Sequence, residues 1–284
     1  QLSNKHWLPP LHARDESTIQ DHYVYLSTAE TTPFQITITT GNGIPIPGSP
    51  FTISQTNPVE VNIGNGQPTD MFLDVTDVNV VKSDKGLILE GTKDFYVSFR
   101  MRHQNHAETL ISKGRPGIGN RFRLGHMINE TSDSRTSFVA SVMATENNTT
   151  LTLSDYNTNV VFTSGSGDIT ADSQSFILNA GQSIVFSGYS SLGANLDGAL
   201  GALIESSKPV AVNSGNILGG IEYGRADICL DQIVSSSQIG DEYIFIEGNG
   251  TPEMELPLII ADQDNTEVFV NGNPIASTTL NAGD

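Results

Sequence analysis

The stretch ATENNTTLTL (Ala144–Leu153) decides the fold, because a matching stretch, ADQDNTEVFV (Ala261–Val270), follows it 117 residues later. Each contains an extended segment, an Asn-Thr turn, and then alternating Thr or Val residues, which is typical of a β hairpin. A weaker copy, AETTPFQITI (Ala29–Ile38), precedes both. This spacing predicts a repeated β unit of roughly 115 residues.

Two further repeats support the same unit. The run LNAG occurs at Leu178–Gly181 and again at Leu280–Gly283, and ILEGTKDFYVS (Ile88–Ser98) aligns with LIESSKPVAVN (Leu203–Asn213). The last unit ends just after its LNAG run, where another strand is due, so we expect the chain to be a fragment of a longer protein. The predicted division is an extended N-terminal strap over 1–21, a first β repeat over 22–136, a second over 137–254, and the start of a third over 255–284.

The strands alternate between apolar and polar residues, as in FQITI and TLTL, so one face of each strand is expected to be dry and the other wet. We therefore predict an all-β fold of tandem antiparallel units, each sandwich-like. A β-propeller built from four-stranded blades is the alternative. In the N-terminal strap, Trp7 stands before two prolines that force an extended course, and we expect it to pack against the first unit.

Charge and composition exclude several classes of protein. The net charge is −18, from 32 acidic and 14 basic residues, which argues against a nucleic-acid partner. A single cysteine, Cys229, excludes an internal disulfide, and its apolar neighbours favour a buried position. No apolar run is long enough for a membrane helix, so no membrane insertion is expected. The first residue, Gln1, is expected to be a mature N-terminus left after removal of an export signal.

Several blocks resemble a known family. KGLILEGTKDFYVSFRMRHQNHAETLISKG, FVASVMATENNTTLTLSDY and LDQIVSSSQIGDEYIFIEG are similar to the N-terminal region of large secreted surface proteins of gliding Bacteroidota. That region is itself similar to the repeat module first named for an IgG-Fc-binding mucus protein. The resemblance implies export by the type 9 secretion system and an adhesin-like role outside the cell or on its surface. It transfers no ligand and no catalytic residue.

The basic residues are concentrated in one part of the chain, with seven of the fourteen between Arg100 and Arg135. In two predicted strands, Arg100 alternates with Arg102 and Arg121 alternates with Arg123, so each pair lies on one face. If the strands are neighbours, four guanidinium groups form one face that suits carboxylate, sulfate or phosphate. Alternatively, acids of a neighbouring unit, for example around Glu130 or Asp133, pair with them and hold the units in register.

Other motifs predict no catalysis. GYSSLG (Gly188–Gly193) has one residue too many for a hydrolase elbow. The pair His103 and His106 lacks a nearby third ligand, and the acidic turn DQDNTE (262–267) loses its aspartates in the equivalent TENNTT, which favours a plain turn over a calcium loop. We expect a non-enzymatic adhesin-like module with no metal or cofactor, whose partner is surface polysaccharide or another surface protein. A structural spacer and a carbohydrate-processing enzyme are the alternatives.

Overall fold

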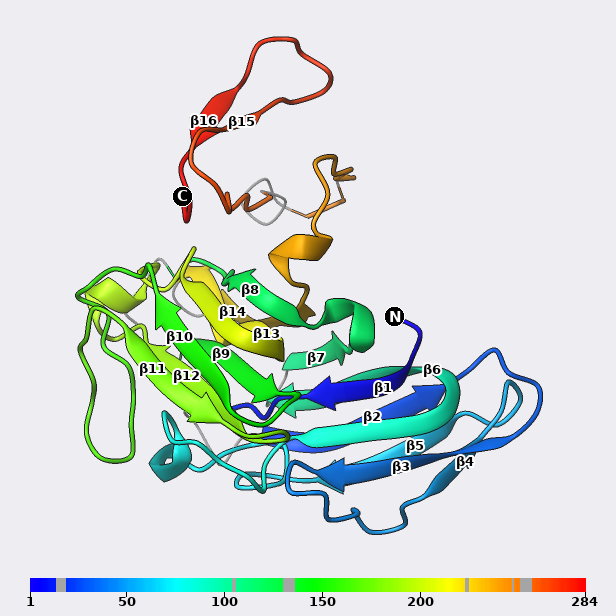
Figure 1. Cartoon of the computed structure of the whole chain (residues 1–284). Helices are drawn as coiled ribbons and strands as arrows, with labels where there is room; N and C mark the ends of the chain where they lie inside the picture. The colour runs from blue at the N-terminus through cyan, green and yellow to red at the C-terminus, as the bar shows by residue number, and fades with distance from the viewer. Residues whose placement is uncertain (14–18, 104–105, 130–135, 223–224, 247, 251–256) are drawn as a thin grey trace.

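The structure is a computed structural model that describes residues 1–13, 19–103, 106–129, 136–222, 225–246, 248–250 and 257–284 (Figure 1). Strands dominate the described residues, and the helical elements among them are short 3-10 turns, so the all-β prediction is confirmed. The strands are β1 (Ser3–Leu8), β2 (Ile19–Ser27), β3 (Phe34–Thr40), β4 (Phe51–Ile53), β5 (Val59–Gly64), β6 (Leu87–His103), β7 (His106–Ile111), β8 (Gly119–Arg123), β9 (Ser137–Ala144), β10 (Thr149–Ser154), β11 (Gln174–Leu178), β12 (Ser183–Tyr189), β13 (Leu203–Glu222), β14 (Arg225–Ile233), β15 (Thr266–Val268) and β16 (Thr278–Leu280). The 3-10 turns are η2 (Val75–Asp77), η3 (Arg115–Gly117), η4 (Gly193–Asn195) and η5 (Ser236–Gln238).

The first sheet is organised around β6, which belongs to two halves of the sheet. Its residues 87–91 pair with β3, and β1 pairs mainly with the same stretch, whereas residues 96–103 pair with β2 and β7. The strands β4 and β5 extend the two halves. Side chains from both halves meet in one buried core that includes Val24, Ile36, Leu89 and Phe99. The unit is therefore sandwich-like, with one long strand shared by its two layers.

The second sheet repeats this pattern of pairing around β13. The strand order β4-β3-β6-β2-β5 of the first sheet becomes β11-β10-β13-β9-β12 in the second. The remaining strands also correspond, because β8 and β14 pair with β13 as β1 and β7 pair with β6. A second buried core includes Val142, Leu151, Phe186 and Ile204. Both sheets thus form antiparallel, sandwich-like units, as predicted from strand alternation.

The stretch Ala144–Leu153 is a corner and not the predicted hairpin. The strands on its two sides, β9 and β10, do not pair with each other, because each pairs with a different part of β13. The bend is made at Asn148, whose φ of 57° lies in the left-handed region that Asn tolerates. The first LNAG run similarly connects β11 in one layer to β12 in the other. The hydrophobic pattern thus located the strands, but the central strand that separates them comes from much later in the chain.

The two sandwiches share a buried joint, in which β9 is covered on both faces. All of its residues are buried. Phe138 and Val142 belong to the core of the second sandwich, whereas Val139 belongs to the core of the first. Met143 packs with Trp7 and other residues at the same joint. A strand covered on both faces shows that the second sandwich is built directly against the first.

Buried hydrogen bonds fix the N-terminal residues in this joint. The Asn213 side-chain amide donates to the Pro9 carbonyl at 3.0 Å, and the Gln232 amide donates to the Trp7 carbonyl at 2.8 Å. Trp7 is 5% exposed and lies on β1, which pairs with β6. Because the amide donors come from β13 and β14, the predicted strap is a strand of the first sheet that also bonds the second sandwich.

The C-terminal segment forms a small two-stranded sheet, β15–β16, that projects from the second sandwich (Figure 1). Its corner repeats the hydrogen bonds of the corner between β9 and β10. In each corner a glycine N–H of LNAG donates to the alanine carbonyl that precedes the turn, and the LNAG alanine N–H donates to a side-chain oxygen in the turn. The donor–acceptor pairs are Gly181–Ala144 and Gly283–Ala261 at 2.8 Å, and Ala180–Asn147 and Ala282–Asp264 at 3.0 Å.

Sheet membership does not follow the predicted division of the chain. β1 falls within the predicted strap but pairs in the first sheet, and β8 falls within the predicted first repeat but pairs with β13 in the second. The reason is that each sandwich begins with a strand that pairs with its central strand, β1 with β6 and β8 with β13. The sequences of β1 and β8 are not similar enough to show that these two strands are equivalent. No helix in the described ranges is both long and apolar enough to cross a membrane.

Candidate functional site

The four candidate arginines alternate with buried residues as predicted. Arg100 and Arg102 are exposed on β6, and Met101 between them is buried. On β8, Arg121 and Arg123 are only partly exposed. Their neighbours Phe122 and Leu124 belong to the second core. The two-residue period of a strand therefore predicted correctly that the two arginines of each pair lie on the same face, opposite their buried neighbours.

The two pairs do not form one arginine face. Arg100 and Arg102 pair with β2 and β7 in the first sheet, whereas Arg121 and Arg123 lie opposite Glu205 and Leu203 of β13 in the second. The prediction of a single four-arginine surface is therefore wrong. Between β7 and β8 the chain passes from one sandwich to the next, so strands that are close in sequence end in different sheets.

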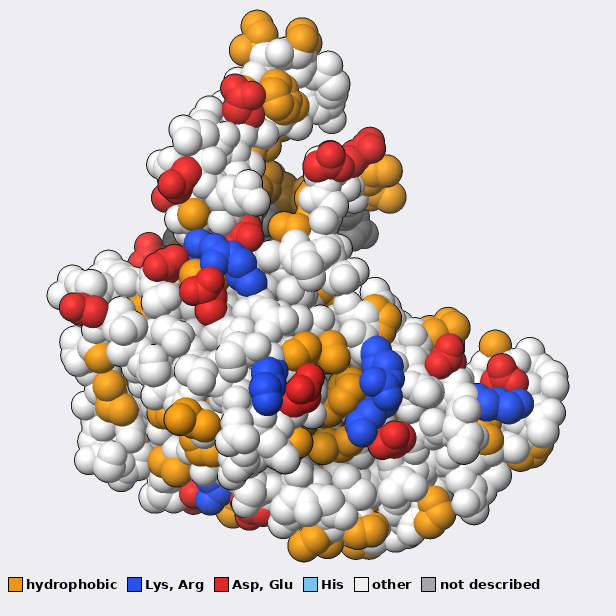
Figure 2. Space-filling model, in the orientation of Figure 1, with side chains coloured by type: hydrophobic (Ala, Val, Ile, Leu, Met, Phe, Trp, Pro, Cys, Tyr) orange, Lys and Arg blue, Asp and Glu red, His pale blue; other side chains and the backbone are white. Residues whose placement is uncertain are grey.

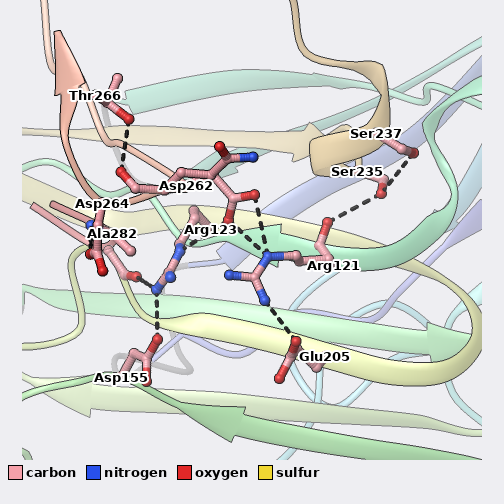
Figure 3. Close-up of polar contacts among 12 residues, drawn as sticks. Arg121, Arg123, Asp155, Glu205, Ser235, Ser237, Asp262, Asp264, Thr266 and Ala282 are labelled. Atoms are coloured by element: carbon pink, nitrogen blue, oxygen red, sulfur yellow. Dashed lines mark hydrogen bonds and ion pairs between the residues drawn. The ribbon is translucent and has the colours of Figure 1, made fainter.

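Arg121 and Arg123 bind one carboxylate from the C-terminal segment (Figure 3). The Arg121 Nε donates to Asp262 Oδ1 at 3.0 Å, and the Arg123 Nε donates to the same oxygen at 3.3 Å. Arg121 also donates to Glu205 at 2.6 Å, and Arg123 donates to Asp155 at 3.0 Å. We call these five residues the arginine–aspartate cluster.

The centre of this cluster is shielded from water. The side chain of Arg123 is 7% exposed and that of Asp262 is 14% exposed, whereas Glu205 is 53% exposed. Burial acts to lower the pKa of Arg121, but hydrogen bonds and charges of Asp262 and Glu205 outweigh it and leave that pKa raised. The cluster joins the second sandwich to the following segment, which agrees with the predicted role of acids from a neighbouring unit. The acids named for that role, Glu130 and Asp133, lie outside the described residues.

The other pair belongs to a surface that also contains tyrosines. The Arg100 guanidinium carbon lies 4.4 Å from the centre of the Tyr25 ring, and the Tyr23 and Tyr25 rings are 6.3 Å apart. Arg102 pairs with Asp21 at 2.7 Å. We call the surface of Tyr23, Tyr25, Arg100 and Arg102 the tyrosine–arginine face.

The tyrosines of this face were missed by the sequence reasoning. The signal was present in HYVYLS, where Tyr23 and Tyr25 alternate with His22 and Val24, both of which are buried. A hydrogen bond from the phenol to Glu60, followed by burial and the Glu60 charge, raises the pKa of Tyr25. The phenol therefore stays neutral at physiological pH. The face combines a stacked guanidinium with neutral phenols, a combination that suits recognition of polar or anionic ligands.

The other candidate ligands have separate partners. His106 Nδ1 lies 3.1 Å from Asp227 Oδ1, and the side chain of His103 lies outside the described residues. In the acidic turn, Asp262 binds the arginines and Asp264 accepts the Ala282 N–H. Within the described ranges, no three His, Cys, Asp or Glu side chains gather in a way that could hold a metal ion.

Comparison with known proteins places more than half of the chain in one family. A family model described as IgGFc binding protein matches residues 107–284. The match includes every strand of the second sheet, β8 to β14, and the C-terminal segment. A search of curated proteins and a search of solved structures each gave no significant match.

Proposed function

The chain belongs to the IgGFc binding protein family, and on that basis we propose that it is a non-enzymatic, adhesin-like module of a secreted or cell-surface protein. In this proposal the tandem sandwiches form a rigid body that carries an adhesive surface outside the cell. Export by the type 9 secretion system and a part in gliding motility are proposed from the resemblance of its sequence blocks to surface proteins of gliding Bacteroidota.

The observation that carries the proposal is the buried joint between the sandwiches. Separate domains joined by a linker bury little of their facing strands. Here β9 is buried on both faces, and Asn213 and Gln232 donate buried hydrogen bonds to the backbone of the N-terminal strand. Units joined in this way move together. Such a body transmits force and keeps a surface at a fixed distance from its support, which suits adhesion and display.

The tyrosine–arginine face is the proposed adhesive surface. Tyrosine and arginine are, with tryptophan, enriched among the residues that dominate the binding energy of protein interfaces, and arginine also binds phosphate and carboxylate. None of the ion pairs between described residues includes Arg100. Arg102 is paired with Asp21, so Arg100 is the cation of this face that we expect to contact acidic polysaccharide or an acidic protein surface.

Binding measurements test this proposal with a matched pair of variants. Immobilised acidic and neutral polysaccharides and IgG Fc, the ligand in the family's description, are each exposed to the native chain. We expect salt-sensitive binding to an acidic ligand that Arg100→Ser with Arg102→Ser weakens about tenfold or more. The control, Arg121→Ser with Arg123→Ser, changes the buried cluster and should leave binding per folded molecule unchanged. Equal loss in both variants would refute the assignment of the face.

The alternative functions give different results in the same preparation. A structural spacer would bind none of these ligands and would keep one fixed shape in small-angle scattering. A carbohydrate-processing enzyme would release soluble sugar from the polysaccharides. Absence of binding together with an intact, rigid shape would favour the spacer over the adhesin.

A further inference from the structure

The C-terminal segment contains a strand with an unpaired edge. β15 pairs with β16 on one side, as β10 pairs with β11. On its other side β10 pairs with the central strand β13, and β3 pairs likewise with β6. Among the described residues, no strand pairs with that side of β15. In both sandwiches, therefore, the central strand covers the edge that is open in β15.

Backbone groups of β15 face this open edge. In β10, the Thr150 N–H donates to the side chain of Ser207, a residue of β13, so the Thr150 N–H faces the central strand. Thr150 lies opposite Ile177 in β11, and the equivalent Glu267 lies opposite Thr279 in β16. Because successive residues of a strand direct their N–H groups to opposite sides, the Glu267 N–H faces the open edge.

Apolar side chains that are buried in the second sandwich are exposed in the C-terminal segment. Val142 is fully buried, but the equivalent Ile259 is 44% exposed. Leu153 is 1% exposed, but the equivalent Val270 is 49% exposed. Hydrophobic side chains lie on the surface of this segment at the top of the space-filling view (Figure 2). In the second sandwich, β13 covers this core with apolar residues such as Ile204 and Val212.

We propose that β15 is an acceptor edge for one further bent strand of the type that β6 and β13 provide. The occupant is an extended polypeptide segment with apolar residues at alternate positions on both sides of a corner. The corner carries a lysine, because Lys93 pairs with Glu30 in the first sandwich and Lys208 donates to the Asn147 carbonyl in the second. The equivalent of Asn147 is Asp264, whose carbonyl and side chain offer a lysine its partner.

A peptide with the sequence of residues 203–215, LIESSKPVAVNSG, tests the proposal in solution with the native chain. We expect saturable binding by fluorescence anisotropy and slower hydrogen exchange in residues 266–270. A peptide of the same composition with its alternation scrambled should bind at least about tenfold more weakly, because its apolar residues no longer share one face.

Two proline variants on opposite edges of the small sheet locate the binding site. Glu267→Pro removes the donor at the open edge and should weaken peptide binding about tenfold. Thr279 lies opposite Glu267 on β16, and the outer edge of β16 corresponds to the outer edge of β11, with which no described strand pairs. Thr279→Pro should therefore leave peptide binding unchanged. Exchange at the Gly283 N–H shows whether the corner stays folded in each variant. Equal binding of the scrambled peptide, absence of saturable binding, or self-association of the chain through β15 would each overturn the proposal.

Discussion

Replacing Asp262 with Ala should release the C-terminal segment from the second sandwich. Breaking a fully buried ion pair costs about 3–5 kcal/mol. Asp262 is 14% exposed, and both arginines keep another acceptor, Glu205 for Arg121 and Asp155 for Arg123. The lower end of that range, about 3 kcal/mol, is therefore expected. It corresponds to roughly a hundredfold increase in the opening equilibrium of the segment.

Hydrogen exchange measured by mass spectrometry follows this opening directly. The N–H groups of Ala261 and Gly283 bond within the corner, so their exchange should accelerate about a hundredfold in Asp262→Ala while exchange in β9 stays slow. The control is Glu205→Ala, whose exposed ion pair is worth under about 1 kcal/mol and should change exchange less than about fivefold. Equal acceleration in both variants, or faster exchange throughout the second sandwich, would refute the assigned energy.

Three further predictions concern the joint and the buried histidines. Burial lowers the pKa of His6 and of His22 to about 4, so the unfolded chain binds more protons than the folded chain below pH 6.5. The free energy of unfolding obtained from urea titrations should therefore be constant above about pH 7 and should fall by about 3 kcal/mol per histidine as the pH is lowered to 4. Met143→Ala at the joint should cost about 2–5 kcal/mol in urea unfolding, and a cost below 1 kcal/mol would mean that the joint is loosely packed. Gly181→Ala should destabilise far more than Gly43→Ala in thermal unfolding, because both positions have positive φ but only a Cβ at 181 would collide with a backbone oxygen, that of Gly41.

Strand positions were predictable from the sequence because they depend on local alternation. The alignment of Ile88–Ser98 with Leu203–Asn213 located both central strands. Their pairing was not predictable in the same way, since β13 pairs with β9 and β10 through contacts between residues far apart in the sequence, such as Leu151 with Ser206 and Val142 with Val212. Turn residues such as Asn and Thr occur in both hairpins and corners. They therefore predicted where the chain bends, but not which strands pair on either side of the bend.

The candidate residues show the same division between local and distant information. The apolar neighbours of Cys229 suggested burial, but Ile228 and Leu230 are buried while Cys229 is exposed, because adjacent strand residues face opposite sides. The same two-residue alternation correctly predicted that the two arginines of each pair share one face of their strand. Whether a pair meets acid or open surface depended on Asp262, which lies 139 residues after Arg123, and no local pattern predicts such a contact.

The double burial of β9 also bears on how such chains change through evolution. A unit that presents a polar exterior to its neighbours can be duplicated, deleted or transplanted as an interchangeable bead. β9 has no exposed face, because Phe138 and Val142 complete its own core, whereas Val139 packs in the core of the preceding unit and Met143 packs with Trp7. Excising the first sandwich would leave Val139 and Met143 without these partners. We therefore expect the two sandwiches to be retained together, with each face of β9 matched to the core that it meets.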